Sequence, residues 1–362
     1  MSSLLRLLDH PSVGTAILLH AKTCRRGLSL IEVLISVFVV SIGLLGIASL
    51  LPIAHHDARQ GTLNDLSALV GKHAWRDLTI RGWNRPLKWY YKNDPTDPVY
   101  DPVLGWLEPG KTGIALAEPP LLVLDPRFVT QSGSSATFPA GGDPNDPNDI
   151  LIQRITVNDG INPSVLIGSL AADEMFTSPD DLAFEAPANS DSVPTQIFTS
   201  THRKRQSHGR FSWMISLVPD SAIGDIYRAS VVVFHQRAVS DDNAERVLTA
   251  FPLHSPVGTS LGGVDVVLKT KNNGSVLDLE VSPGEWIALQ TIQEPFDMRW
   301  YRVKRTSGEP KKLSAHYSLE VSLEGPDTDL EKLFPLGEAQ AVIVENVQAV
   351  FEKTIRLDFS PS

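Results

Sequence analysis

Apolar residues fill one long stretch near the N-terminus. From Leu28 to Ala54 the only ionisable side chain is that of Glu32. At about 1.5 Å per residue, a helix of this length spans about 40 Å, which exceeds the hydrocarbon core of a membrane, about 30 Å. An ordinary single-pass anchor would have the same hydropathy, but a carboxylate in lipid costs at least a few kcal/mol and is usually kept because it has a partner. The pattern predicts a membrane-spanning helix in which Glu32 has a specific role.

The apolar pattern changes after Ala54 but stays helical. Apolar residues recur three and four positions apart, with charged residues between them, at Leu63, Leu66, Val70, Ala74 and Leu78. This spacing is typical of a helix with one buried face. Arg81-Gly82 is a helix stop. We therefore expect one long helix over about residues 28–82, transmembrane over about 28–54 and packed on a globular domain beyond that.

Period-two and short apolar runs dominate the remaining chain, residues 83–362. They predict an antiparallel hairpin from 211–218 and 226–234, a second from 264–268 and 276–281 around an Asn-Gly turn, and a third from 285–289 and 298–303. Final strands are expected at 341–344 and 354–359. The predicted fold class is α+β, with one long N-terminal helix on a mostly antiparallel β-sheet domain with long loops. The pattern leaves open whether the sheet region is one domain or two.

Charge is divided unequally along the chain. Residues 1–27 carry +3, whereas the whole chain carries −10, which leaves −13 on the remainder. Basic residues before an apolar span stay in the cytoplasm, so we expect the bulk of the chain on the other side of the membrane. An acidic exported domain argues against a nucleic-acid partner. The single cysteine, Cys24, precedes the apolar run, so no disulfide framework is expected after it.

The junction between the basic and apolar segments reads Arg25-Arg26-Gly27, then Leu28-Ser-Leu-Ile-Glu32. It resembles the class III signal of type IV prepilins and type II secretion pseudopilins. The resemblance implies that a membrane-embedded peptidase cuts between Gly27 and Leu28 and methylates the new amine of Leu28. It also implies that Glu32, fifth after the cut, pairs with the amine of a neighbouring subunit, and that Arg25 and Arg26 hold the leader in the cytoplasm. The family usually has phenylalanine where this chain has Leu28.

The same resemblance implies a minor pilin or minor pseudopilin with three parts: a leader (1–27), the long helix (28–82) and an exported β-rich domain (83–362). Its expected place is the bacterial inner membrane, as a single-pass protein with an extracytoplasmic C-terminal domain, or a pilus or pseudopilus. Its expected partners are prepilin peptidase, other pilin or pseudopilin subunits, an inner-membrane assembly platform and membrane lipid. The alternative is a non-polymerising, single-pass anchored binding protein, with the aromatic segment 83–106 as its contact surface.

The sequence contains no His-Glu-x-x-His or Cys-x-x-Cys motif. The Walker A pattern occurs once, at residues 105–112, and Gly-x-Ser-x-Gly occurs once, at residues 258–262. Neither lies in the predicted strand-turn-helix context that gives these motifs their chemistry. We therefore expect a protein that is not an enzyme and that needs no cofactor or metal.

Asp143, Asp146 and Asp149 recur every third residue and could offer oxygen ligands to calcium, but repeated Asp-Pro turns explain them as well. Residues 202–210 form a dense basic run that could meet anionic lipid or an acidic neighbour, or simply be a solvated loop.

Overall fold

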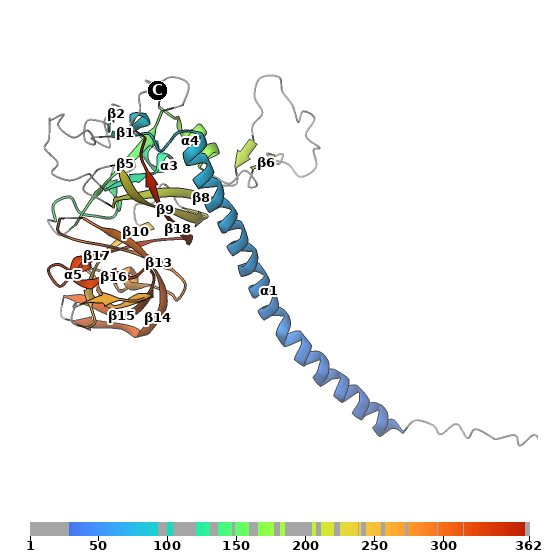
Figure 1. The fold of residues 1–362 in the computed structure, drawn as a ribbon. Coiled ribbons are helices and arrows are strands. Elements are labelled where there is room, and N and C mark those ends of the chain that lie inside the picture. The colour runs from blue at the N-terminus through green and yellow to red at the C-terminus, as the bar shows by residue number, and fades with distance from the viewer. Residues whose placement is uncertain are drawn as a thin grey trace, which may run out of the picture. The chain divides into compact units, whose positions relative to one another are not determined.

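The computed structural model describes residues 29–92, 100–103, 121–130, 137–146, 149–158, 166–176, 182–184, 205–207, 211–220, 225–237, 239, 244–254, 258–271, 274–294, 296–313 and 315–358. The chain forms two compact units, Met1–Arg59 and Gln60–Ser362. Helix α1, Leu30–Ile80, begins in the first unit and ends in the second (Figure 1).

Helix α1 confirms the predicted long helix. Pro52 lies inside it, so the carbonyl of Ala48 lacks the backbone donor that it would otherwise meet. The helix ends at the predicted stop: Gly82 adopts a left-handed φ of 64°, its N–H donates to the carbonyl of Thr79 (3.2 Å), and the N–H of Trp83 donates to that of Leu78 (2.9 Å). This pair of bonds is a Schellman cap, and it needs a residue that tolerates positive φ.

An eight-stranded sheet forms one part of the second unit, in the order β18-β9-β8-β3-β5-β1-β2, with β4 paired to β5. The pairs are antiparallel except β3 with β5. Its strands are β1 (Trp89–Lys92), β2 (Tyr100–Pro102), β3 (Leu122–Leu124), β4 (Thr137–Phe138), β5 (Ile152–Val157), β8 (Phe211–Pro219), β9 (Ile226–His235) and β18 (Val347–Arg356). The chain also forms the short helices η1 (Pro86–Lys88), α3 (Pro126–Val129) and α4 (Ser169–Met175), and a separate antiparallel pair of strands, β6 (Leu182–Phe184) with β7 (Arg205–Ser207).

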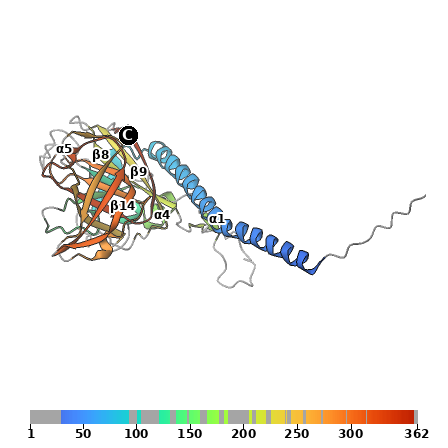
Figure 2. The ribbon, with the colours of Figure 1, turned by 90° about the horizontal axis from the view of Figure 1, so that it is seen from below.

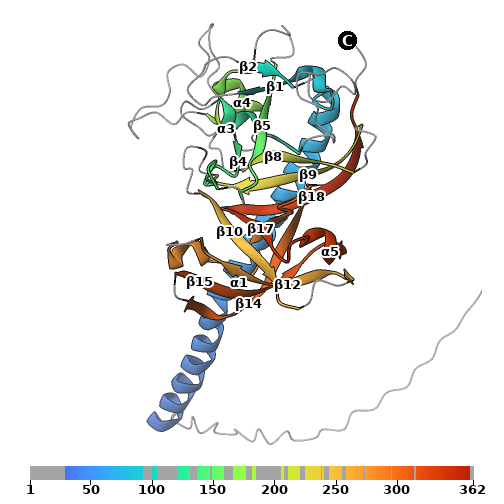
Figure 3. The same cartoon turned by 90° about the vertical axis from the view of Figure 1, so that its left-hand side faces the viewer.

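A closed antiparallel barrel forms the other part, in the order β10-β12-β15-β14-β13-β17. Its strands are β10 (Glu245–Pro252), β12 (Gly263–Lys269), β13 (Trp286–Gln290), β14 (Met298–Leu313), β15 (His316–Glu324) and β17 (Ala339–Val344). The chain also forms η4 (Val276–Leu279), α5 (Leu330–Leu333) and the short pair β11 (Thr259–Ser260) with β16 (Thr328–Asp329). Figure 3 shows the barrel strands beside the sheet strands, and Figure 2 gives the view from below.

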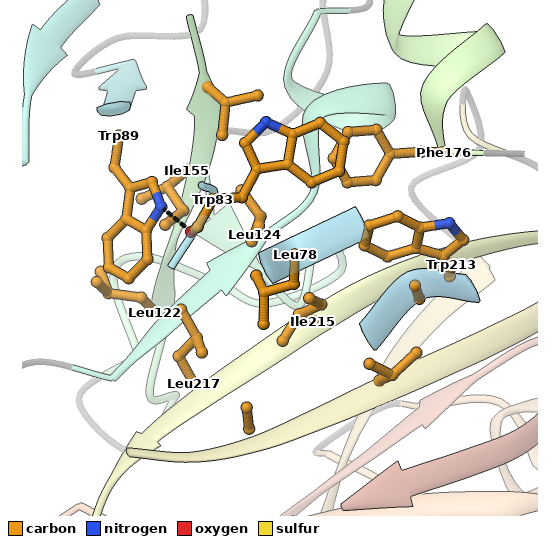
Figure 4. Close-up of a cluster of buried hydrophobic side chains, with 14 of the residues drawn as sticks. Leu78, Trp83, Trp89, Leu122, Leu124, Ile155, Phe176, Trp213, Ile215 and Leu217 are labelled. Atoms are coloured by element: carbon orange, nitrogen blue, oxygen red, sulfur yellow. Dashed lines mark hydrogen bonds between the residues drawn. The ribbon is translucent and has the colours of Figure 1, made fainter. Parts of the chain in front are cut away.

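Strand β8 explains how the sheet is buried on both faces. Successive side chains of a strand point to opposite faces. Trp213, Ile215 and Leu217 share a cluster with Val70, Ala74 and Leu78 of α1, as Figure 4 shows for the labelled members. Met214 and Val218, which alternate with them along the strand, belong to a cluster that also holds Ala288, Trp300 and Val342 of the barrel. Because both faces are covered, β8 is apolar nearly throughout and does not alternate cleanly.

Two of the three predicted hairpins are confirmed, β8 with β9 and β13 with β14. The hairpin of 264–268 with 276–281 is wrong. Strand β12 pairs with β10 and β15, and residues 276–279 form η4 instead. Ser275 and Asp278 make a reciprocal capping box, which starts the helical turn, and Leu279 and Val281 pack inside the barrel. The predicted strand 354–359 begins earlier, because β18 spans Val347–Arg356; Phe359 lies outside the described residues.

The aromatic segment after α1 is anchored in the core rather than exposed where the structure describes it. Trp83 and Trp89 are buried, and the indole N–H of Trp89 donates to the carbonyl of Trp83 (2.8 Å). Trp83 stacks on Phe176 of the α4 region, with ring centroids 4.7 Å apart. Residues 93–99 and 104–120 lie outside the described residues. The fold class is α+β, with a long N-terminal helix and mostly antiparallel sheets, as predicted.

Candidate functional site

Glu32 lies in the first turn of α1. Its backbone N–H donates to the carbonyl of Ser29 (2.9 Å), as does that of Val33 (3.2 Å), so the helix is closed from this turn onward. A carboxylate near a helix N-terminus is favoured by the partial positive charge of that end. Its side chain is exposed, so it is open to a partner outside its own helix.

The rest of the first unit is an apolar helix surface. Helix α1, Leu30–Ile80, contains a stretch that is long and apolar enough to cross a membrane, and none of that stretch is buried. Large apolar side chains there are mostly exposed, as in Leu30 (78%), Phe38 (64%) and Leu45 (70%). Leaving such a surface in water is unfavourable at about 25 cal/mol per Å² of apolar area. Lipid or other helices would remove this cost.

Three serine hydroxyls inside the apolar stretch are satisfied within the helix. The hydroxyls of Ser36, Ser41 and Ser49 donate to the carbonyls of residues three or four positions earlier, each at 2.7 Å. A helix crossing lipid needs this internal pairing. Gly43 and Gly46 have no atom within 4 Å of where a Cβ would stand, which leaves their surface open for the close approach of another helix.

The other predicted residues of this site lie outside the described residues: Arg25, Arg26, Gly27 and Leu28. The described part therefore contains Glu32 and the helix that follows, but not the predicted cut. His55 and His56 are exposed on α1, and His202 and His208 also lie outside the described residues.

The aspartates at 143, 146 and 149 form turns. The carbonyl of Asp143 accepts from the N–H of Asp146 (3.1 Å), and that of Asp146 from the N–H of Asp149 (3.0 Å). The ammonium of Lys271 pairs with Asp149 and lies 3.7 Å from Asp146. Hydrogen bonds from the backbone and side chain of Asn145 lower the pKa of Asp143. Among the described residues, no group of three or more histidine, cysteine or carboxylate side chains could hold a metal ion.

Sequence reasoning missed a buried ion cluster where the sheet meets the barrel. Asp125 follows β3, Arg154 lies in β5, Arg237 follows β9, and Glu245 begins β10. Arg237 donates to both carboxylate oxygens of Asp125 (2.9 and 2.7 Å) and to Glu245 (3.3 Å). Arg154 pairs with the same two carboxylates and lies over the ring of Phe128 (3.8 Å to the centroid).

Two positive and two negative charges balance in this ion cluster. Burial alone would raise the pKa of Asp125, but the charges of Arg237 and Arg154 outweigh burial and hold that pKa below its ordinary value. The four residues are separated by up to 120 positions, so no local motif marks them. The one visible sign is an arginine, Arg154, in a short strand that is buried at five of its six positions. The cluster is complete in itself, and we assign it a structural role in holding the barrel to the sheet.

Comparison with protein-family models matches residues 22–48 to the prokaryotic N-terminal methylation motif. The matched segment contains Gly27, Leu28 and Glu32, and it runs into the exposed apolar part of α1. Comparison with curated proteins gives no match, and neither does comparison with solved structures.

Proposed function

We propose, from the premise that this chain is a type IV pilin-like, membrane-anchored subunit, that it is a minor pilin or minor pseudopilin. In this proposal prepilin peptidase cuts it between Gly27 and Leu28, and it then joins a pilus or a type II secretion-like filament. Its role is structural assembly, as is typical of pilin-like proteins, rather than catalysis. The observation that carries the proposal is the position of Glu32, inside the matched motif and in the first turn of an exposed apolar helix.

The chemistry of assembly follows from the two charges near the cut. Cutting leaves a cationic amine at Leu28, about one helical turn before Glu32. When the helix enters a filament, the amine of a neighbouring subunit neutralises Glu32 as both leave water. At 4 Å and an effective dielectric constant of 20, the Coulomb attraction is about 4 kcal/mol before the cost of desolvation. This is enough to favour the correct register over a slipped one.

The apolar surface of α1 supplies the non-specific part of the binding. Its exposed leucine, isoleucine, valine and phenylalanine side chains fit lipid before assembly and neighbouring helices afterwards. We place the protein in the bacterial inner membrane, with its C-terminal domain, residues 83–362, outside the cytoplasm. The proposed partners are prepilin peptidase, other pilin-type subunits, the inner-membrane assembly platform and membrane lipid.

The size of the exported part favours a minor subunit. Residues 83–362 build both a sheet and a barrel, more bulk than a shaft subunit needs when many copies must pack closely. A subunit used in few copies, at a tip or during initiation, has no such restriction.

Processing tests this proposal directly. The full chain is expressed with and without an active prepilin peptidase, and its size is followed by immunoblot. We expect a loss of about 27 residues that depends on the peptidase, and no loss in Gly27→Ala, because the proposed peptidase cuts after glycine and the variant places a Cβ at that position. Ser2→Ala, which changes a leader residue far from the cut, is the control. Processing of Gly27→Ala at the same bond would contradict the assigned cut site.

A further inference from the structure

Four positions form a row across the outer face of the barrel, on four neighbouring strands. Trp286 of β13 lies opposite Arg302 of β14, Arg302 lies opposite Glu324 of β15, and Glu324 lies opposite Gly263 of β12. Their neighbours Ile287, Tyr301 and Leu323 belong to the cluster inside the barrel, so the row faces outward. At about 4.8 Å between strands, the row is about 14 Å long.

The row lines two adjoining depressions. One, of about 500 Å³, is lined by Trp286, Trp300, Arg302, Glu324 and Glu352, among others. The other, of about 760 Å³, is lined by Asp265, Lys304, Arg305 and again Glu324. They meet at Glu324 and Gly262 and together form one groove. Gly263 keeps the row open, because its φ is 151° and a Cβ there would lie 2.0 Å from the carbonyl oxygen of Leu323.

Side chains in the row are available to a ligand. Arg302 and Glu324 are both exposed and directly opposite each other, yet no ion pair within 4.0 Å joins these two described residues. The Nε of Arg302 donates to the carbonyl of Gly284 (3.2 Å), which fixes the guanidinium and leaves its two terminal nitrogens. The indole N–H of half-buried Trp286 donates to the carbonyl of Gln348 (3.4 Å), so what Trp286 offers the groove is an apolar ring.

The chemistry of the groove selects the class of ligand. It combines an aromatic ring with polar donors and acceptors, and its lining carries both signs of charge: Arg302, Lys304 and Arg305 beside Asp265 and Glu324. Glu352, which also lines it, is paired with Arg228 (3.6 Å). A strongly charged ligand would be attracted by one set and repelled by the other. A peptide adding as a strand would need a free sheet edge, but at the row both sides of β14 and β15 are paired.

We propose that this groove binds a neutral oligosaccharide. A sugar ring has an apolar face, which packs on the Trp286 ring, and hydroxyls that accept from Arg302 and donate to Glu324. The row is extended, so it suits a chain of sugars rather than a single ring. This inference is independent of how the N-terminus is processed, because every residue in it lies in the barrel or in β18.

Binding is tested on the full chain in lipid nanodiscs by calorimetry and by saturation-transfer NMR. The probes are three neutral trisaccharides, namely chitotriose, cellotriose and maltotriose, with the anionic trigalacturonate as comparison. We expect saturable binding of at least one neutral probe, and binding of trigalacturonate that is at least about tenfold weaker. Trp286→Ala should weaken binding of that neutral probe at least about tenfold, and Arg302→Gln and Glu324→Gln should each weaken it severalfold.

Matched controls separate binding from folding. Trp75→Phe changes a half-buried tryptophan of α1, and Lys332→Gln changes a lysine that is 81% exposed on α5; neither should alter binding. Arg302 and Glu324 are exposed, so their variants should keep the wild-type thermal unfolding. Absence of binding by all three neutral probes at about 10 mM would overturn the proposal. So would equal binding of trigalacturonate, or unchanged binding in both Trp286→Ala and Arg302→Gln.

Discussion

Glu32 shows how much one residue can specify. Among 27 otherwise non-ionisable positions from Leu28 to Ala54 it is the single carboxylate, and it lies in the first turn of α1. Its cost in lipid is what makes a pairing role physically reasonable. The sequence alone singles out this residue, because it is the one charge in a local apolar run, and its pairing role stays a prediction.

Replacing Glu32 tests the pairing role. We expect Glu32→Ala to be cut by the peptidase as efficiently as the wild type, because the cut lies one turn away, but to enter filaments at least about tenfold less well, since the charge pair is lost. The measurement is the amount of subunit in sheared filaments relative to that in the membrane. Ser36→Ala, one turn further along α1, is the control. Wild-type incorporation of Glu32→Ala would remove Glu32 from the mechanism.

The buried ion cluster, unlike Glu32, is not marked by any local sequence pattern. Asp125, Arg154, Arg237 and Glu245 come from four separate strands or strand ends, so only the folded structure brings them together. Asp125→Asn should lower the free energy of unfolding by about 3–5 kcal/mol, because it leaves two buried guanidinium groups without a full counter-charge. Urea unfolding of the full chain measures this. Asp225→Asn, which breaks a pair with the 80% exposed Arg356, should cost less than about 1 kcal/mol.

The effect of Asp125→Asn on stability should also depend on pH. The pKa of Asp125 is lowered in the folded state, so its contribution to stability is complete above its unfolded pKa of about 3.9. The contribution is lost as the pH falls below that value and through the lower folded pKa. The difference between wild type and Asp125→Asn should therefore be constant near neutral pH and shrink in strong acid. A difference that instead grew in acid would contradict this ion-pair account.

At the scale of elements, sequence patterns correctly predicted the helix and the hairpins that depend on interactions between residues close in the chain. Helix α1 and its stop at Gly82 follow from periodicity and from glycine's tolerance of positive φ, and the two confirmed hairpins follow from short connections. The hairpin predicted with 276–281 was wrong, because a capping box at Ser275 starts a helical turn there and Leu279 of that turn packs in the barrel. An apolar run of six residues does not distinguish a strand from a helical turn, so the pattern could not settle that case.

Packing of α1 on the sheet predicts a contrast between two of its glycines. A Cβ on Gly71 would lie 2.3 Å from the ring of Phe351 in β18, whereas a Cβ on Gly61 meets nothing within 4 Å. Gly61→Ala should stabilise the protein by up to about 1 kcal/mol through helix propensity. Gly71→Ala should lose that gain and destabilise by about 1–3 kcal/mol relative to Gly61→Ala, since the ring must move. Urea unfolding of both variants measures the contrast; equal stabilities would show that α1 does not pack closely here.

At the scale of the whole molecule, the α+β class was predictable but the closed barrel was not. The barrel closes through β10 with β17, where Glu245 lies opposite Val344, and pairs so distant in sequence leave no local trace. The ion cluster and the groove depend on the same long-range pairing, so sequence reasoning could not find them. The proposed N-terminal function, by contrast, depends on a contiguous segment of the chain, which contains the matched motif at residues 22–48.

The central claim is that this chain is processed as a prepilin. Mass spectrometry of the intact, membrane-extracted protein from cells with active prepilin peptidase tests it most directly. The account predicts an N-terminus at Leu28 carrying one methyl group on its amine. A protein that still began at Met1 in those cells would contradict it and would favour an anchored protein that does not polymerise.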